Sequence, residues 1–282
     1  MQHRAARNPR ADRVAVSNAL SHQIRSDPRT TMTETESLLR AIGANRDDNT
    51  VRLAYADHLD ELGGEVNEAH AEYIRLQVRH HQFPSLASDS TRESYLFRTF
   101  ASRWRPRIPG FEVNLHSRRG FPCRVRVSAS AVLAAIDDPF SWVFDEVALF
   151  VDVAAADLIA ALQSPLATGL TELWIHAPEG TGSACVSAIA SASFPRLEQL
   201  ILNGLWLTDS DVRQICIATG LPRLEALDLG HNQITDTGAD ALCAAPFASR
   251  LRRLVLANNN IRSAAAARIS RRFGTALVGG LP

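Results

Sequence analysis

The hexapeptide LEALDL, residues 224–229, is one of four similar stretches that decide the fold of this chain. The stretches begin at Leu170, Leu197, Leu224 and Leu251, so each starts 27 residues after the one before. Each carries leucine or isoleucine at its first, fourth and sixth positions. A fixed period of this length is typical of proteins whose units stack, because one unit alone cannot bury its apolar face. The period therefore predicts an α/β repeat architecture.

Each repeat has room for a short strand, a turn and a helix. Successive side chains of a strand point to opposite faces, so the leucines are expected to lie in the interior. Helices are predicted over segments such as 209–218 and 236–244, where Thr235 or Asp236 can accept hydrogen bonds from the first backbone N–H groups.

Weaker copies of the pattern precede the four clear repeats. Phe144, Val147 and Leu149 have the same spacing and lie 26 residues before the repeat that begins at Leu170. A short strand around Val125 precedes them. We therefore predict degenerate units over residues 120–169 and clear repeats from there to the end of the domain at residue 282.

Two asparagines strengthen the assignment. Asn232 and Asn259 occupy the same position in the last two repeats, and with the spacing they make the chain resemble the ribonuclease-inhibitor-like class of leucine-rich repeats. That resemblance implies a solenoid with parallel strands on a concave face, helices on a convex face, and asparagine side chains bonded to turn backbone. Leu205 and Pro178 stand at this position in the two earlier repeats, where the pattern is less regular.

The N-terminal third carries a second signature. DDNTVRLAYADHLDELGG, residues 47–64, and AEYIRLQ, residues 71–77, resemble the bacterial repeat-companion domain, which typically precedes leucine-rich repeats. Ala54, His58 and Gly64 depart from the usual residues. The resemblance implies a small helical module that accompanies a repeat scaffold, and it brings no established activity with it. Helical spacing of apolar residues agrees, with Tyr55, Leu59 and Leu62 expected on one buried face.

The chain therefore divides into four predicted segments. Residues 1–31 are polar and rich in arginine, and we interpret them as a disordered tail, a gene-model extension before Met32, or a transit peptide. Residues 32–82 form the companion domain and residues 83–119 a connector with one helix, expected from Glu93 to Trp104. Residues 120–282 form the repeat domain.

Several functional classes find no support in the sequence. No apolar run reaches the roughly 18 residues that a membrane span needs. The four cysteines form no C-x-x-C pair and no zinc spacing, and reduced thiols suit the cytoplasm. G-x-S-x-G, P-loop and H-E-x-x-H motifs do not occur. We therefore predict a cytoplasmic protein that is not an enzyme and uses no cofactor or metal.

Charge is unevenly spread although the formal net charge is zero. Residues 143–249 hold 3 arginines and 13 acids, whereas residues 250–282 hold 7 arginines and no acid. The acidic part is interpreted either as a surface that attracts a basic protein or as a solvated face. For the C-terminal arginines, pairing with acids of the preceding repeat is favoured over nucleic-acid binding, because no aromatic platform or groove-reading motif accompanies them.

The residues between the leucines of each strand are the candidate partner-binding set, because alternation places them on the concave face. Trp174 beside Ile201 would form an apolar anchor of the kind that dominates interfaces, unless the companion domain or the connector covers it. The candidate residues are Glu172, Trp174, His176, Gln199, Ile201, Asn203, Asp228, Arg253 and Val255.

The function that this pattern favours is non-catalytic binding of another protein through the concave face. The alternatives are an acidic, inhibitor-like receptor for a basic protein and a substrate-recruiting subunit of a larger enzyme system, such as a ligase or effector. The sequence does not identify the partner.

Overall fold

A computed structural model describes residues 32–84, 90–114, 116–138, 141 and 143–278, so the predicted tail lies outside the described residues. Most strands join one sheet of eight, in the order β1-β4-β5-β6-β7-β8-β9-β10. All neighbours are parallel except β1, which pairs antiparallel with β4 at one edge. The strands are β1 (Phe111–Val113), β4 (Arg124–Ser128), β5 (Glu146–Phe150), β6 (Glu172–His176), β7 (Gln199–Ile201), β8 (Ala226–Asp228), β9 (Arg253–Val255) and β10 (Leu277–Val278).

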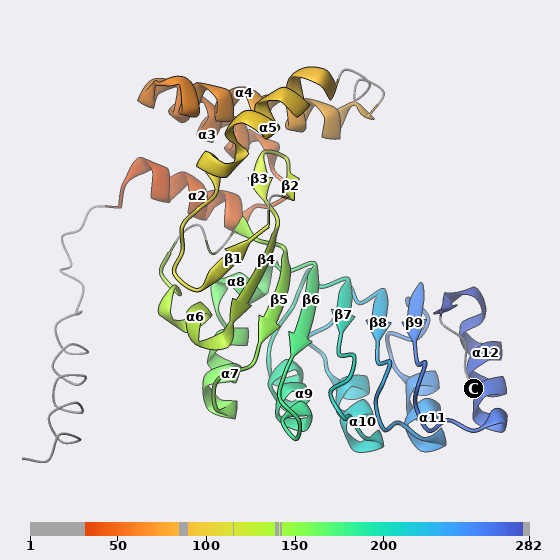
Figure 1. The fold of residues 1–282 in the computed structure, drawn as a ribbon. Helices are drawn as coiled ribbons and strands as arrows, with labels where there is room; N and C mark the ends of the chain where they lie inside the picture. The colour runs from red at the N-terminus through yellow and green to blue at the C-terminus, as the bar shows by residue number, and fades with distance from the viewer. Residues whose placement is uncertain (1–31, 85–89, 115, 139–140, 142, 279–282) are drawn as a thin grey trace, which may run out of the picture. The chain divides into compact units, whose positions relative to one another are not determined.

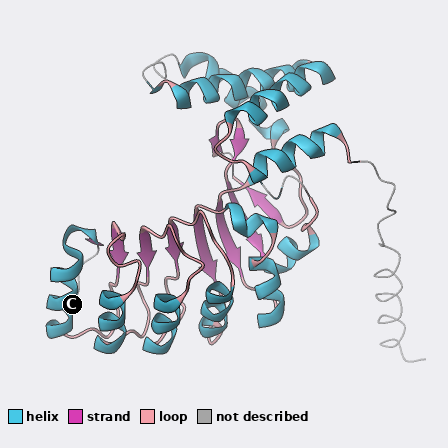
Figure 2. Cartoon of the chain, turned by 180° about the vertical axis from the view of Figure 1, so that it is seen from behind, coloured by secondary structure: helices cyan, strands magenta, loops and turns pink. Residues whose placement is uncertain are grey.

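A helix follows most of the parallel strands, and the helices lie in a row along one side of the sheet (Figures 1 and 2). Neighbours in this row pack on one another, as α9, α10, α11 and α12 do in turn. The row comprises α6 (Ala129–Ala134), α7 (Ala155–Leu162), α8 (Pro165–Gly169), α9 (Gly182–Ser191), α10 (Asp209–Ile217), α11 (Asp236–Ala244) and α12 (Ser263–Phe273), with a short 3-10 turn, η3 (Gly274–Ala276), before β10.

The register of the sheet confirms the predicted 27-residue period. Leu173, Leu200, Leu227 and Leu254 are Cα partners in neighbouring strands, and each is at most 1% exposed. Burial of one such side chain stabilises the fold by about 1.5–3 kcal/mol. β5 pairs with β6 at an offset of 26 residues, the same spacing that separates Phe144 from Leu170 in the sequence.

Asn232 bonds to turn backbone as the resemblance implies. Its carboxamide oxygen accepts from the N–H groups of Leu205 and Leu207 at 3.0 Å, and its nitrogen donates to the carbonyls of Leu202 and Leu229. Asn259 repeats these bonds one unit later, to Ile234 N–H and to the carbonyl oxygens of Leu229 and Leu256. Buried backbone groups are thereby satisfied where the chain turns away from each strand.

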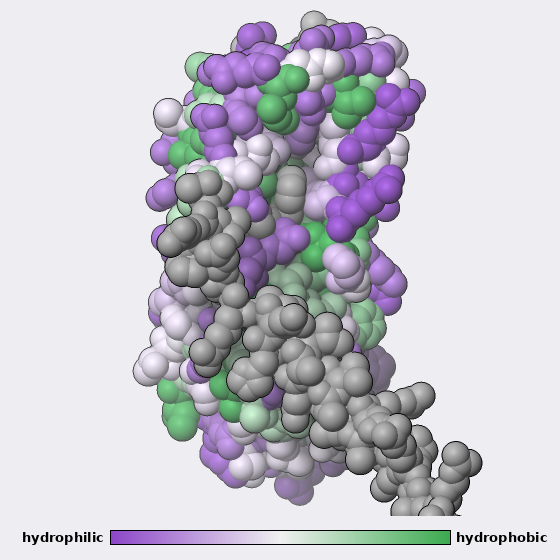
Figure 3. Space-filling model, turned by 90° about the vertical axis from the view of Figure 1, so that its left-hand side faces the viewer, coloured by the Kyte–Doolittle hydropathy of each residue, from purple (hydrophilic) through white to green (hydrophobic). Residues whose placement is uncertain are grey.

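Among the described residues, four helices precede the sheet: α2 (Glu34–Ala44), α3 (Asn49–Leu62), α4 (Glu65–Gln82) and α5 (Ser90–Trp104). One core contains Leu39, Ile42, Tyr55 and Ile74 with neighbouring residues, and a second joins Tyr73 of α4 to Leu96 and Phe100 of α5. The face in Figure 3 is largely hydrophilic over this segment, with scattered hydrophobic residues.

Two features of α3 concern the exposure of its last residue and its ion pairing with α4. Leu62 is 57% exposed, so its predicted burial is wrong; α3 ends at this residue because Gly63 has φ 68° and turns the chain away. Asp57 of α3 pairs with Arg75 of α4 at 2.6 Å, whereas Arg52 forms no ion pair with it. Arg52 instead donates to the Asp48 carbonyl oxygen and lies near the Phe121 ring.

A small hairpin joins the helices to the sheet and was not predicted. It consists of β2 (Ser117–Arg118) and β3 (Phe121–Pro122). Phe121 belongs to the apolar core of α2, α3 and α4. At the turn, the Arg119 guanidinium donates to the carbonyl oxygens of Arg46 and Asp47. The hairpin therefore ties the helices to the strand that follows it.

Candidate functional site

One face of the parallel sheet is left open by the helix row, and we call it the open face. It carries the side chains that alternate with the buried leucines, so all nine predicted partner-binding residues lie on it or directly beyond its strands. The register aligns them in rows across the strands. Trp174 stands beside Ile201, Ile201 beside Asp228, and Asp228 beside Val255.

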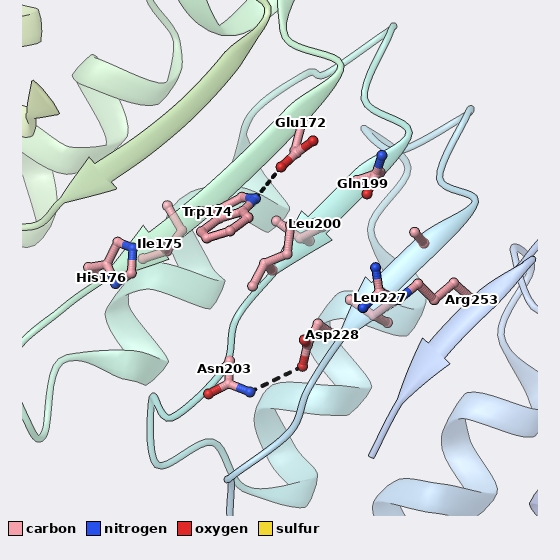
Figure 4. A pocket seen from close by; sticks show the side chains of 12 residues that line it. Glu172, Trp174, Ile175, His176, Gln199, Leu200, Asn203, Leu227, Asp228 and Arg253 are labelled. Carbon is pink, nitrogen blue, oxygen red and sulfur yellow. Dashed lines mark hydrogen bonds between the residues drawn. The ribbon is translucent and has the colours of Figure 1, made fainter. Parts of the chain in front are cut away.

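Trp174 is the largest exposed side chain on this face. It is 40% exposed to solvent, so the described residues do not cover it. Its Nε1–H donates to the Glu172 carboxylate, which fixes the plane of the indole (Figure 4). Aromatic side chains held in one orientation lose little conformational entropy on binding and are enriched among energetically dominant interface residues.

Two hollows flank Trp174. The larger has a volume of about 450 Å³ and is lined by eight of the nine predicted residues, all except Val255. The other has a volume of about 320 Å³ and extends over β4 and β5, to Arg124 and Arg126. Glu172, Trp174 and His176 line both, so the indole forms a ridge between them.

An aromatic line extends from Trp174 into the degenerate units. The His176 ring stacks on Phe150 with centroids 4.8 Å apart, and the Arg126 guanidinium lies 5.0 Å from the Phe150 centroid. Burial, and then the charge of Arg126, lower the pKa of His176. The prediction missed Phe150 and Arg126 because candidate rows were drawn only through the clear repeats. The 26-residue spacing could have supplied Phe150, which stands one unit before His176, whereas Arg126 follows only from the pairing of β4 with β5.

Asp228 is held in place by its neighbours. Its Oδ1 accepts from the Gly230 backbone N–H at 2.9 Å. The same oxygen accepts from Asn203 Nδ2 at 3.4 Å (Figure 4). A Cβ at position 230 would lie 2.8 Å from Asn203 Nδ2, so glycine leaves the space that this arrangement uses. One carboxylate oxygen, Oδ2, accepts no hydrogen bond from the described residues.

Charges on the open face are balanced rather than acidic. From β4 to β9 its outward positions carry three acids, Glu146, Glu172 and Asp228, against Arg124, Arg126 and Arg253. Arg124 pairs with Glu146 at 2.6 Å and lies 4.0 Å from Glu172. The other ten acids of residues 143–249 lie at strand ends, in turns and on helices.

The C-terminal arginines pair across repeats, as predicted. Arg268 donates two hydrogen bonds to Asp240 at 2.8 Å, and Arg262 binds Asp236 at 3.0 Å. Arg252 lies 3.2 Å from Glu225. Each pair joins the last repeat to the one before it, which leaves fewer cations for phosphate groups.

Cys123, Asp145 and Glu146 form the one group of potential metal ligands among the described residues, with ligand atoms within 4.8 Å of one another. Their environment disfavours a cation. Arg118 binds Asp145 at 3.1 Å and Arg124 binds Glu146 at 2.6 Å, so arginines already neutralise the carboxylates. Burial and the adjacent acids raise the pKa of Cys123 to about 12, which keeps the thiol protonated, whereas metals bind the thiolate.

Comparison with known proteins identifies one unit of the repeat. Residues 221–243 match the family model of the leucine-rich repeat. The chain therefore contains a leucine-rich repeat, which spans β8 and nearly all of α11. Such repeats are generally associated with protein–protein interaction. No curated protein matches the chain. Among the described residues, no helix combines the length and apolarity that crossing a bilayer requires.

Proposed function

We propose that this chain is a non-catalytic binding protein that recognises another protein through the open face of its sheet. In this proposal residues 120–282 form a leucine-rich-repeat solenoid whose concave wall is the open face. Residues 32–82 act as a helical companion domain and residues 83–119 as the connector. The free cysteines suit a cytoplasmic location. No metal or cofactor takes part.

The observation that carries the proposal is the exposed, oriented indole of Trp174 between two hollows. Trp174 lies outside the described hydrophobic core, and an oriented aromatic side chain beside hollows that can receive a partner is typical of the residues that dominate interfaces. The surrounding polar groups, Glu172, Gln199 and Asn203, supply a rim of donors and acceptors around this centre, as protein interfaces have.

The test is affinity capture from native lysate with the full chain and with Trp174→Ala. Trp206 gives a matched control, because it is 52% exposed but lines neither hollow. We expect Trp174→Ala to lose the captured partner by at least tenfold, Trp206→Ala to retain it, and both variants to keep the thermal midpoint within about 2 °C.

Two results would contradict the proposal. Equal capture by the wild type and Trp174→Ala would show that the open face is not the binding surface. A large fall in the thermal midpoint of Trp174→Ala would show that the indole is part of the core. Repeating the capture at high salt separates the acidic-receptor alternative, because attraction between exposed charges is screened above about 0.15 M.

A further inference from the structure

We propose that Trp174, Ile201 and Asp228 form a subsite for one cationic side chain, arginine or lysine, of the partner protein. This inference rests on the proposed function and specifies the chemistry of what the open face recognises. Trp174, Ile201 and Asp228 are neighbours across the sheet. The apolar side chains match the aliphatic stem of arginine or lysine, and the carboxylate matches its charged end.

The first part is the acceptor for the charged end. Asp228 Oδ1 is occupied by the Gly230 N–H and by Asn203, so the carboxylate is held in one orientation. Its Oδ2 accepts no hydrogen bond from the described residues, and Asp228 lines the 450 Å³ hollow. A carboxylate fixed before binding forms a charge-assisted hydrogen bond at little entropic cost.

The second part is the apolar path to that acceptor. Trp174, Ile201 and Asp228 are register partners in β6, β7 and β8. Adjacent strands are about 4.8 Å apart, so the indole lies on the order of 10 Å from the carboxylate with Ile201 between them. Arginine and lysine carry a long aliphatic stem that covers apolar surface while its charged end stays polar. The stem would lie on Ile201, and the next apolar group of the partner on Trp174.

The remaining charges around the hollow favour a cation at Asp228 over an anion. Glu172 accepts from Trp174 Nε1 and stands near Arg124, so it is already engaged. Arg253 is the cation that opposes the subsite. It lines the same hollow, and its guanidinium forms no hydrogen bond or ion pair with the described residues. It is diagonal to Asp228, since its Cα partner is Ala226.

The test uses a displayed library of random 12-residue peptides, selected on the full chain and counter-selected on Trp174→Ala. We expect the enriched peptides to carry arginine or lysine next to an aromatic or aliphatic residue. For the best peptide, Asp228→Asn should weaken Kd at least tenfold, because asparagine keeps the acceptor for Gly230 but loses the charge. Asp157→Asn, on exposed α7, should change it less than twofold.

Arg253→Ala is a second control, for which the expected change in affinity has the opposite sign. If a cation binds at Asp228, Arg253→Ala removes a repelling charge and should strengthen binding about twofold. Weaker binding of Arg253→Ala, or enrichment of peptides rich in aspartate and glutamate, overturns the inference in favour of an anionic partner segment. Enrichment of apolar peptides without basic residues also overturns the inference. Whether the selected peptides are acidic or apolar, the proposed function stands. Failure to enrich any peptide that depends on Trp174 overturns the subsite and the proposed function together.

Discussion

At the scale of single residues, the repeats reuse one backbone conformation just after each strand. Gly204, His231 and Asn258 are 27 residues apart, and all have positive φ, at 71°, 55° and 58°. Side chains other than glycine adopt this region at a cost, and asparagine and histidine are among those that tolerate it best. The His231 ring and the Asn258 amide lie 3.0 Å apart, so neighbouring units support each other there.

His70 is a buried titratable residue whose neutral form the fold requires. Its ring stacks on Trp104 with centroids 4.8 Å apart, and Nε2 lies 2.9 Å from the carbonyl oxygen of Gly120. Burial lowers the pKa of His70 from 6.5 to about 4. The unfolded chain therefore takes up the proton first, so stability is complete above pH 6.5 and falls as the pH drops toward 4.

We predict that this residue accounts for about 3 kcal/mol of the stability lost between pH 6.5 and pH 4, from the shift at 1.36 kcal/mol per pKa unit. Urea unfolding at a series of pH values should show a shallower pH dependence for His70→Phe than for the wild type. His116→Ala, at an exposed position, should keep the wild-type dependence. Parallel curves for His70→Phe and the wild type would refute the assignment.

At the scale of elements, the β2–β3 hairpin depends on one glycine. Gly120 has φ 89°, and a Cβ there would lie 2.3–2.9 Å from Ile74 of α4. Its N–H also donates to Gln77 Oε1 at 2.7 Å. The hairpin turn is therefore pressed against the helix, and the position has no room for a side chain.

Gly120→Ala should destabilise the chain by about 3 kcal/mol or more, since it combines an unfavourable φ with overlap in a packed core. Gly204→Ala is the matched control, because its φ is 71° and no atom lies within 4 Å of the added Cβ. That variant should lose only about 1 kcal/mol. Denaturant unfolding measures both, and equal losses would mean that the contact with Ile74 contributes nothing.

The elements also show what the sequence could predict. The parallel strands of the clear repeats could be predicted because the same 27-residue pattern recurs in each unit, so that each unit supports the assignment of the others. β1, β2 and β3 have three residues or fewer and carry no copy of the repeat pattern, so their antiparallel pairing could not be predicted from the period. On the open face the clear repeats supplied nine residues, whereas Phe150 could be found from the 26-residue spacing and Arg126 only from the register of the strands.

At the scale of the whole described chain, the helices and the sheet share a polar junction as well as an apolar one. Arg46 is 4% exposed and donates to the carbonyl oxygen of Phe144 at 2.6 Å, and burial lowers its pKa to about 10. Arg119 donates to the carbonyl oxygens of Arg46 and Asp47, in the loop between α2 and α3. Hydrogen bonds from arginine to carbonyl oxygens are directional, so they fix how the helices are oriented against the sheet. Apolar packing alone would allow the helices to slide along the sheet.

The outermost link of this junction is the pair of Asp47 and Arg196, which are 149 residues apart in the chain. Two hydrogen bonds of 2.7 and 2.9 Å join them, and they lower the pKa of Asp47 to about 2. The Asp47 side chain is 70% exposed, so water screens most of this attraction. A double-mutant cycle with Asp47→Ala and Arg196→Ala should therefore give a coupling of only about 0.5–1 kcal/mol at low salt.

The pH dependence of that coupling tests its origin. Because the pKa of Asp47 is depressed in the folded state, the coupling is present above the ordinary value near 3.8 and disappears as the pH falls through about 2. The exposed pair of Asp57 and Arg75, which joins α3 to α4, is the control within the helical segment. A coupling for Asp47 and Arg196 that is zero at low salt and pH 7 would mean that Arg46, Arg119 and the Phe121 core hold the helices against the sheet without it.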